Sequence, residues 1–158
     1  MDWRQVDTDN CSVARALAVV GEKWSLLVLR DAFNGLRRYD ELRRHLGISD
    51  AVLADRLRTL VAAGVLERRS YQEPGRRSRV EYLVTAAGWD LQPVVVGLLQ
   101  WGDRHLGDDS GPPVEVRHRG CGGAVEAVVR CAEDGKVLTP AETQLTPGPG
   151  LRLRPVEG

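Results

Sequence analysis

The sequence is short of several features that would assign it to a common class. Three cysteines in 158 residues are too few for the disulfide framework of a small secreted protein, so we expect a reduced, cytoplasmic chain. No apolar run approaches the ~18 residues of a membrane-spanning helix, and the acidic, polar start MDWRQVDTDN has no apolar signal core. Neither common glycine-rich phosphate loop is present, nor is an HExxH helix. A binding protein, or an enzyme without a common signature, remains.

The chain also lacks net charge, with 22 basic and 22 acidic residues, but the balance is uneven along its length. Residues 1–36 carry four basic and five acidic side chains, and residues 80–158 carry seven and eleven. Residues 37–79 carry eleven arginines against six acids. A basic stretch inside a folded domain is a candidate phosphate-facing surface, although a solvated helix face has the same composition.

Apolar periodicity predicts four helices before the middle of the chain, over residues 11–21, 24–33, 37–47 and 50–63. The second is apolar nearly all round, which is typical of a buried helix. Gly47 suits the end of the third helix, and Ser49 suits the N-cap of the fourth. Two short helices joined through Gly47-Ile48-Ser49 have the spacing of a helix-turn-helix.

Strand-like segments at 65–71 and 78–84 flank a turn that contains Pro74-Gly75 and two arginines. A hairpin with a basic tip after a helix-turn-helix is the winged-helix arrangement. A long helix is then expected over 86–106, kinked at Pro93. The sequence therefore predicts a mainly α fold with a small β wing, a winged helix-turn-helix over 1–107. A small β-rich C-terminal extension is expected over 108–158, with strand-like runs at 114–118 and 124–131.

The expected helix 86–106 carries more apolar surface than one small domain needs, which indicates a homodimer interface. The alternative is a helix packed across its own domain. Residues of the first and last expected helices would form the interface: Val13, Leu17, Leu91, Val95, Leu98 and Trp101.

Several motifs occur in an order and spacing that resemble the HxlR-type transcriptional regulators, over residues 11–106. They are Cys11-Ser12-Val13, Gly21-Glu22-Lys23-Trp24-Ser25, Arg37-Arg38-Tyr39-Asp40-Glu41-Leu42, Val52 to Leu60, Ala63 to Arg69, Val80-Glu81-Tyr82 and Trp101-Gly102. The resemblance implies a homodimeric bacterial or archaeal repressor or activator that binds inverted-repeat operators in double-stranded DNA. It also implies that a cysteine near the start of the first helix senses electrophiles or oxidants in some members.

In that arrangement the helix 50–63 would lie in the major groove, where arginine reads guanine and where side chains near the helix start reach base edges. Ser49 and Asp50 have helix capping as the competing role. Other arginines would position the fold on phosphates. The expected DNA-binding residues are Arg37, Arg38, Arg43, Ser49, Asp50, Val52, Arg56, Arg76, Arg77 and Arg79.

Cys11 lies at the expected start of the first helix, where a thiol becomes a better nucleophile, so it is the redox-sensor candidate. The competing role is that of a small buried apolar residue, and the nearby Asp7 and Asp9 work against a reactive thiol. His118, Cys121, Cys131 and Asp134 resemble a zinc-ribbon knuckle pair whose last cysteine is replaced by the aspartate. A metal-free hairpin is the alternative, and no cofactor other than this zinc is expected.

Two rival functions come from other classes. A small enzyme would use Cys11 or Cys121 as nucleophile with His45, His105 or His118 as base, but no fixed local spacing supports such a pair, and we do not expect an enzyme. A winged-helix dimerisation or effector-binding module without sequence-specific DNA binding is the alternative function, and the basic middle argues against it. The expected partners are double-stranded DNA, a second copy of the chain, and a small electrophile or other effector, with no membrane.

Overall fold

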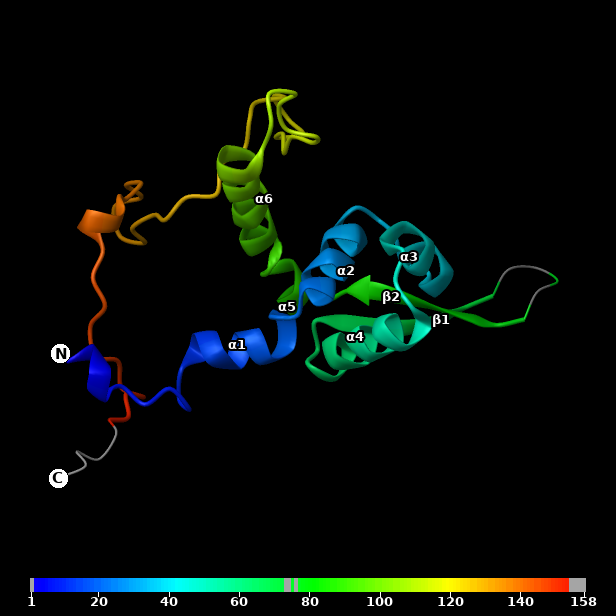
Figure 1. Ribbon diagram of the computed structural model, residues 1–158, viewed down its shortest axis with the longest axis horizontal. Helices are drawn as coiled ribbons and strands as arrows, with labels where there is room; N and C mark the ends of the chain where they lie inside the picture. Colours follow the sequence, from blue (N-terminus) through cyan, green and yellow to red (C-terminus); the bar gives the residue numbers. More distant parts are fainter. Residues whose placement is uncertain (1, 73–74, 76, 154–158) are drawn as a thin grey trace. The chain divides into compact units, whose positions relative to one another are not determined.

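The structure, a computed structural model, describes residues 2–72, 75 and 77–153 (Figure 1). The chain divides into two compact units, Met1–Asp90 with Thr146–Gly158, and Leu91–Leu145. This division falls before the long helix of the second unit, whereas the sequence places a boundary after it, at residue 107; that boundary stays a prediction. Within the described residues, no helix has both the length and the apolar character needed to cross a membrane.

The first unit begins with a short 3-10 turn, η1 (Trp3–Gln5), followed by α1 (Ser12–Val20) and α2 (Lys23–Phe33). Helix α1 buries only Val20, whereas α2 lies at the centre of the unit, as its apolar composition predicts. The buried apolar side chains of this unit come from α1, α2, α3, α4 and the start of the hairpin: Val20, Val28, Leu29, Ala32, Leu42, Leu53, Leu57, Leu60, Val65 and Leu66.

The predicted helix-turn-helix is confirmed as α3 (Tyr39–Leu46) and α4 (Asp50–Ala62). The Glu41 carboxylate accepts a hydrogen bond from the Arg38 backbone N–H at 3.1 Å and so fixes the start of α3. Gly47 ends this helix with φ +64°, a left-handed conformation that favours glycine. Ser49 then caps α4, since its hydroxyl accepts the Val52 N–H at 3.3 Å.

The wing is an antiparallel pair, β1 (Leu66–Tyr71) and β2 (Arg79–Val84), in which Leu66 pairs with Val84 and Tyr71 with Arg79. Figure 1 shows this hairpin projecting past α3 and α4. A further isolated bridge joins Arg38 to Glu81, and the Tyr82 N–H donates to the Arg37 carbonyl at 2.8 Å. The segment that enters α3 therefore fixes the base of the wing, a long-range pairing that the sequence pattern does not reveal.

A buried carboxylate joins α2 to α3. Asp31 is 2% exposed, and its two oxygens accept hydrogen bonds from the Arg30 guanidinium and from His45 Nδ1, the latter at 2.6 Å. Burying a carboxylate is costly unless it is paired, so these two bonds account for its position. His45, one of the bases in the rival enzyme hypothesis, is thus engaged in a structural contact.

The prediction of a single kinked helix over 86–106 is wrong. The structure has two helices instead, α5 (Ala86–Trp89) and α6 (Gln92–Leu106). Pro93 lies in the first turn of α6, where its missing N–H costs no hydrogen bond, and the chain breaks at Asp90-Leu91 rather than bending around the proline. Within the first unit, Trp89 of α5 stacks on Phe33 of α2 with ring centroids 5.0 Å apart.

The extension forms less regular structure than the sequence suggests. The runs 114–118 and 124–131 make isolated antiparallel bridges, Arg117 with Ala124 and Arg130 with Val137, rather than strands, and a 3-10 turn, η2 (Pro140–Glu142), follows. Gly120, Gly122 and Gly123 lie between the two runs, and glycine weakens strand pairing because it has no side chain to pack. Gln100 of α6 holds the second run, because its amide donates to the Val125 carbonyl at 2.6 Å and accepts the Ala127 N–H at 2.9 Å.

Ser25 of α2 is a buried polar residue whose contribution to stability can be measured. Its side chain is fully buried, and its hydroxyl has no hydrogen-bond partner among the described residues. Ser25→Ala should therefore raise the free energy of unfolding by about 1 kcal/mol, since an unpaired buried hydroxyl is costly and alanine is the better helix former. Urea unfolding at unchanged m-value measures the effect. A lower midpoint would show that the hydroxyl makes a stabilising contact.

Candidate nucleic-acid interface

The outward face of α4 contains the residues expected to read DNA. Val52 is 37% exposed, while Leu53, Leu57 and Leu60 on the opposite face are buried. One face of α4 is therefore packed in the core, and the other is exposed to solvent. Ser49 uses its hydroxyl as the N-cap, which confirms capping as its role in the free protein. The first turn of α4 thus presents two exposed apolar side chains, Ala51 and the larger Val52, and these suit contact with a thymine methyl.

Asp50 is engaged by α3 from two sides. Its carboxylate accepts a hydrogen bond from the Arg43 guanidinium at 3.3 Å, and its backbone carbonyl accepts one from the Tyr39 hydroxyl at 2.9 Å. Partial burial raises the pKa of Tyr39, and the negative charge of Asp50 adds to the shift. Tyr39 therefore stays a neutral hydrogen-bond donor that joins the two helices. Because Arg43 already pairs with a carboxylate, Asp50 competes with the phosphate that Arg43 is expected to bind.

Arg56, expected to read guanine, is also paired in the structure. Its guanidinium bonds the adjacent Asp55 carboxylate, which bonds Arg58 as well at 3.0 Å, and the Arg56 side chain is only 22% exposed. A guanine contact at this position would require Arg56 to exchange the carboxylate for a base. The contact between Arg56 and guanine stays a prediction, because the Asp55 carboxylate competes with the base for the guanidinium group.

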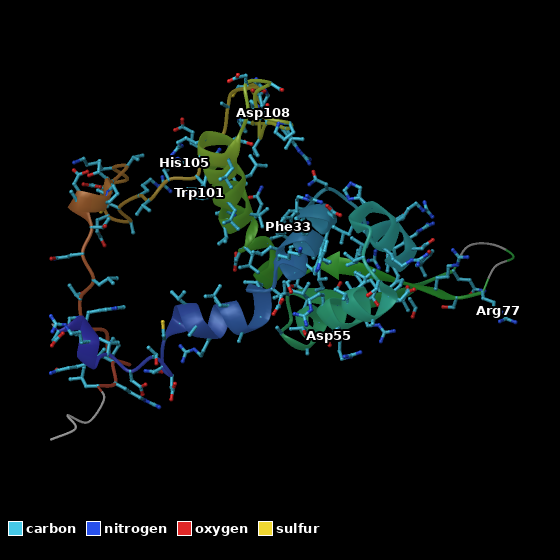
Figure 2. All side chains as sticks on the ribbon, in the orientation of Figure 1. Phe33, Asp55, Arg77, Trp101, His105 and Asp108 are labelled. Atoms are coloured by element: carbon cyan, nitrogen blue, oxygen red, sulfur yellow. The ribbon has the colours of Figure 1, made fainter. Side chains whose placement is uncertain are left out.

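Other arginines of the basic middle are free to meet phosphate. Arg37, Arg77 and Arg79 are exposed and make no ion pair with any residue the structure describes. Arg77 points away from the body of the unit near the end of the hairpin, as Figure 2 shows. Arg38 instead lies over the Tyr71 ring, 4.8 Å from its centroid. Arg76 lies outside the described residues.

Two further arginines of this stretch, which the sequence pattern does not single out, are candidates for phosphate contact. Arg44 on α3 and Arg68 on β1 are exposed and likewise have no acidic partner in the described part of the chain. Arg69 beside Arg68 bonds Glu81, which lies opposite it on the facing strand, at 2.8 Å. Alternation along β1 was the available signal, because neighbouring strand residues face opposite ways.

The residues expected at a dimer interface differ in exposure. Val13 and Leu17 on α1 are 66% and 56% exposed, and Leu98 and Trp101 on α6 are 51% and 54% exposed. Leu91 and Val95 are partly buried. Exposed apolar side chains at helical spacing on α1 and on α6 each suit a protein contact.

The four expected metal ligands separate into two pairs. His118 Nδ1 lies 3.1 Å from Cys121 Sγ, and Cys131 bonds the Asp134 carboxylate. The pKa of Asp134 is lowered, first by the Lys136 backbone N–H and then by Cys131. No group of three or more potential ligands occurs in the described ranges, so the structure offers no preformed four-ligand zinc site there. Zinc binding stays a prediction that would need the two pairs to come together.

Cys11 precedes α1 and is partly buried, and all three cysteines are free thiols. It lies at the N-cap position, where its side chain makes no capping hydrogen bond. The structure therefore confirms the expected place of Cys11, while its sensing role stays a prediction.

Three comparisons with known proteins agree with this geometry. The family model of the HxlR-like helix-turn-helix matches residues 19–110. The uncharacterized HTH-type transcriptional regulator Rv3095 of Mycobacterium tuberculosis is 43% identical over 90% of this chain and 89% of its own. The crystal structure of PA1607, a candidate transcription factor, aligns with a TM-score of 0.77 at 36% identity, covering 88% of this chain and 96% of that one.

The oxidized form of the redox regulator HypR is similar over a shorter range. It aligns with a TM-score of 0.55 at 32% identity, over 60% of this chain and 97% of that one. The described helix-turn-helix, the wing and the matched range of sequence lead to one assignment. The chain belongs to the HxlR-like helix-turn-helix family of DNA-binding transcriptional regulators.

Proposed function

We propose that the protein binds an inverted-repeat operator as a homodimer and represses transcription there. The observation that carries the proposal is a set of exposed arginines near the helix-turn-helix and on the wing that have no acidic partner among the described residues. Arg37 precedes α3, and Arg77 and Arg79 lie on the wing. Free guanidinium groups bind phosphates and orient the fold, while the exposed first turn of α4 faces base edges.

The homodimer is supported by the apolar side chains that α1 and α6 leave exposed. Two-fold symmetry would match two half-sites spaced by one turn of duplex, about 34–36 Å, or a multiple of it. A dimer bound across such a site excludes other proteins from the same DNA, which favours repression. DNA as the partner, and three free thiols, support a cytoplasmic location.

Thiol modification is the proposed switch. Cys11 directly precedes α1, on which Val13 and Leu17 would contact the second subunit, so an adduct on the thiol would alter the dimer. The structural likeness to the redox regulator HypR supports this part of the proposal. We propose no catalytic role: of the candidate bases, His45 is bound to the buried Asp31.

Selection of bound duplexes from a random pool, with and without the oxidant diamide, tests the proposal. We expect a two-fold symmetric consensus, recovered from the reduced protein and lost with oxidant. A Cys11→Ser variant should recover the same consensus under both conditions. If the protein selects no consensus and binds heparin no better than its net charge suggests, the alternative of a winged-helix module without sequence-specific DNA binding is the correct one.

Arg77→Ala should weaken binding to all duplexes alike and reduce the slope of log affinity against log salt concentration by about one. The reason is that a phosphate contact releases counterions but reads no base. Mobility-shift titrations at several salt concentrations measure the slope. Arg119→Ala is the matched control, because Arg119 is an exposed arginine of the second unit, outside the basic middle. An unchanged slope for Arg77→Ala would remove the wing from the DNA contact.

A further inference from the structure

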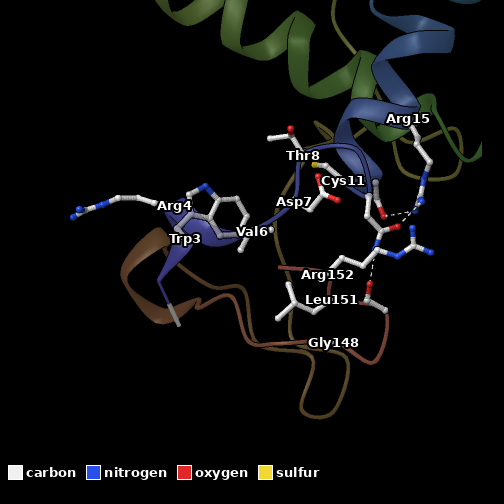
Figure 3. Close-up of a pocket in the computed structure, with 13 residues that line it drawn as sticks. Trp3, Arg4, Val6, Asp7, Thr8, Cys11, Arg15, Gly148, Leu151 and Arg152 are labelled. Carbon is white, nitrogen blue, oxygen red and sulfur yellow. Dashed lines mark hydrogen bonds between the residues drawn. The ribbon is translucent and has the colours of Figure 1, made fainter. Parts of the chain in front are cut away.

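The first unit contains a cavity that the DNA-binding function does not use. It lies between residues 3–15, which lead into α1, and residues 148–152 near the other end of the chain, and its volume is about 580 Å³ (Figure 3). Pockets that bind small organic molecules fall within about 300–1,000 Å³. The size therefore suits a ligand of one or two rings.

Hydrogen bonds join the two segments that form the walls. Val6 and Leu153 form an antiparallel bridge, and the Asp7 N–H donates to the Arg152 carbonyl at 3.0 Å. The Asn10 amide donates to the Gly150 carbonyl, and Gly150 is itself part of the lining. The walls are thus held by specific bonds between distant parts of the sequence.

The lining combines apolar surface with positive charge. Trp3, Val6 and Leu151 supply the apolar part, and the Trp3 side chain is 60% exposed, so its ring is available for stacking. Arg4, Arg15 and Arg152 also line the cavity, against a single acid, Asp7.

The charge of Arg15 is not neutralised by its contacts. Its guanidinium bonds the Asn10 side-chain oxygen and the Ser12 hydroxyl, both at 3.1 Å and both neutral groups. Arg152 is exposed and has no ion pair with a described residue. Among the described residues, the one ion pair of Arg4 is with Asp2, at 3.9 Å. Because arginine binds carboxylates through paired N–H donors, this lining favours an anion.

We propose that this cavity binds a small organic anion with a flat apolar body, such as an aromatic carboxylate. The ring stacks on Trp3 and contacts Val6 and Leu151, and the anionic group bonds Arg15 or Arg152. Bound ligand bridges residues 148–152 to the start of α1. Its effect on the dimer rests on the proposed function, whereas binding itself does not, so binding is measured without DNA.

The test uses three probes that share one ring system: 1-naphthoate, the neutral 1-naphthalenemethanol and the cationic 1-naphthylmethylammonium. Calorimetric titration of the full-length protein should show 1-naphthoate binding about tenfold tighter than the neutral probe, and the cation weakest, because a charge-assisted hydrogen bond is added. Arg152→Gln should reduce the preference for the anion, and Trp3→Ala should weaken all three probes. Arg119→Gln, which removes an exposed charge outside the lining, should change neither.

Cysteine labelling locates the probe on the protein. Cys11 lines the cavity, whereas Cys121 and Cys131 do not. Saturating 1-naphthoate should slow the alkylation of Cys11 by iodoacetamide, as followed by mass spectrometry, and should leave the rates at the other two cysteines unchanged. Equal affinity for the three probes, or binding without protection of Cys11, would overturn the proposal. Binding without any change in DNA affinity would confirm the site and refute only its coupling to the dimer.

Discussion

Leu57→Ala should lower the free energy of unfolding by about 2–5 kcal/mol, because it removes a fully buried side chain and leaves a cavity beneath α4. Leu57 is 1% exposed and lies between Leu53 and Leu60 on the same helix face. Helix α4 packs against α2 and β1, which also contribute buried side chains to the core. These neighbours therefore have little freedom to move into the cavity that the alanine would leave. Chemical denaturation followed by far-UV circular dichroism measures the loss.

Val52→Ala is the control on the opposite face of the same helix. Val52 is 37% exposed, so the change should cost within about 0.5 kcal/mol of stability. It should nevertheless reduce affinity for the selected operator more than affinity for random duplex, since it removes an apolar contact to a base. Leu57→Ala protein that remains folded should keep the specificity of the wild type. Equal stability losses for the two variants would contradict the assignment of the faces of α4.

Gly88→Ala should destabilise the first unit by about 1–3 kcal/mol or more, through overpacking. A Cβ atom added at Gly88 would lie 2.3 Å from the Val65 carbonyl oxygen and 2.7 Å from a Val84 methyl group. The first of these is backbone, at the start of the hairpin, and cannot rotate away. Relief of the clash would have to move α5 off the base of the wing, where the Thr85 hydroxyl caps α5 by accepting the Gly88 N–H at 3.1 Å.

Gly102→Ala is the control for Gly88→Ala, because it adds the same methyl group at a position where no side chain or distant backbone is in the way. Apart from its chain neighbours and the backbone of α6 itself, no atom of the described residues lies within 4 Å of a Cβ built at Gly102, so this variant should be unchanged or more stable by up to about 1 kcal/mol. Thermal unfolding of both variants, at matched concentration, compares them. A destabilisation of Gly102→Ala as large as that of Gly88→Ala would mean that helix α6 packs its Gly102 face against a second subunit.

Local patterns in the sequence predicted the elements that depend on short-range chemistry. The apolar period placed α1 to α4 within two residues of their observed ends, and Ser49 was expected as a cap and is one. The prediction of one helix over 86–106 is wrong because Pro93 lies in the first turn of a new helix and does not kink a continuous one. The regular strands of the extension did not form, since strand propensity needs partners that the isolated bridges do not supply.

The charge pattern predicted a DNA-binding stretch at residues 37–79, but it could not show which arginines of that stretch lack an acidic partner. Arg56 lies beside Asp55 in the sequence, so its pairing had a visible signal, whereas the Arg43–Asp50 and Arg69–Glu81 pairs arise because different elements meet. The same packing of elements leaves Arg44 and Arg68 without an acidic partner in the described part of the chain.

The sequence by itself determined the family, the helix-turn-helix and the basic wing, because these follow from residue types at fixed local spacing. Only the tertiary structure decided which guanidinium groups have acidic partners and that Arg37 and Tyr82 join α3 to the wing. It also decided that residues from 3–15 and 148–152 come together to line one cavity. These contacts form between segments that are far apart in the sequence. Local sequence patterns do not show which of those segments lie close together in the folded chain.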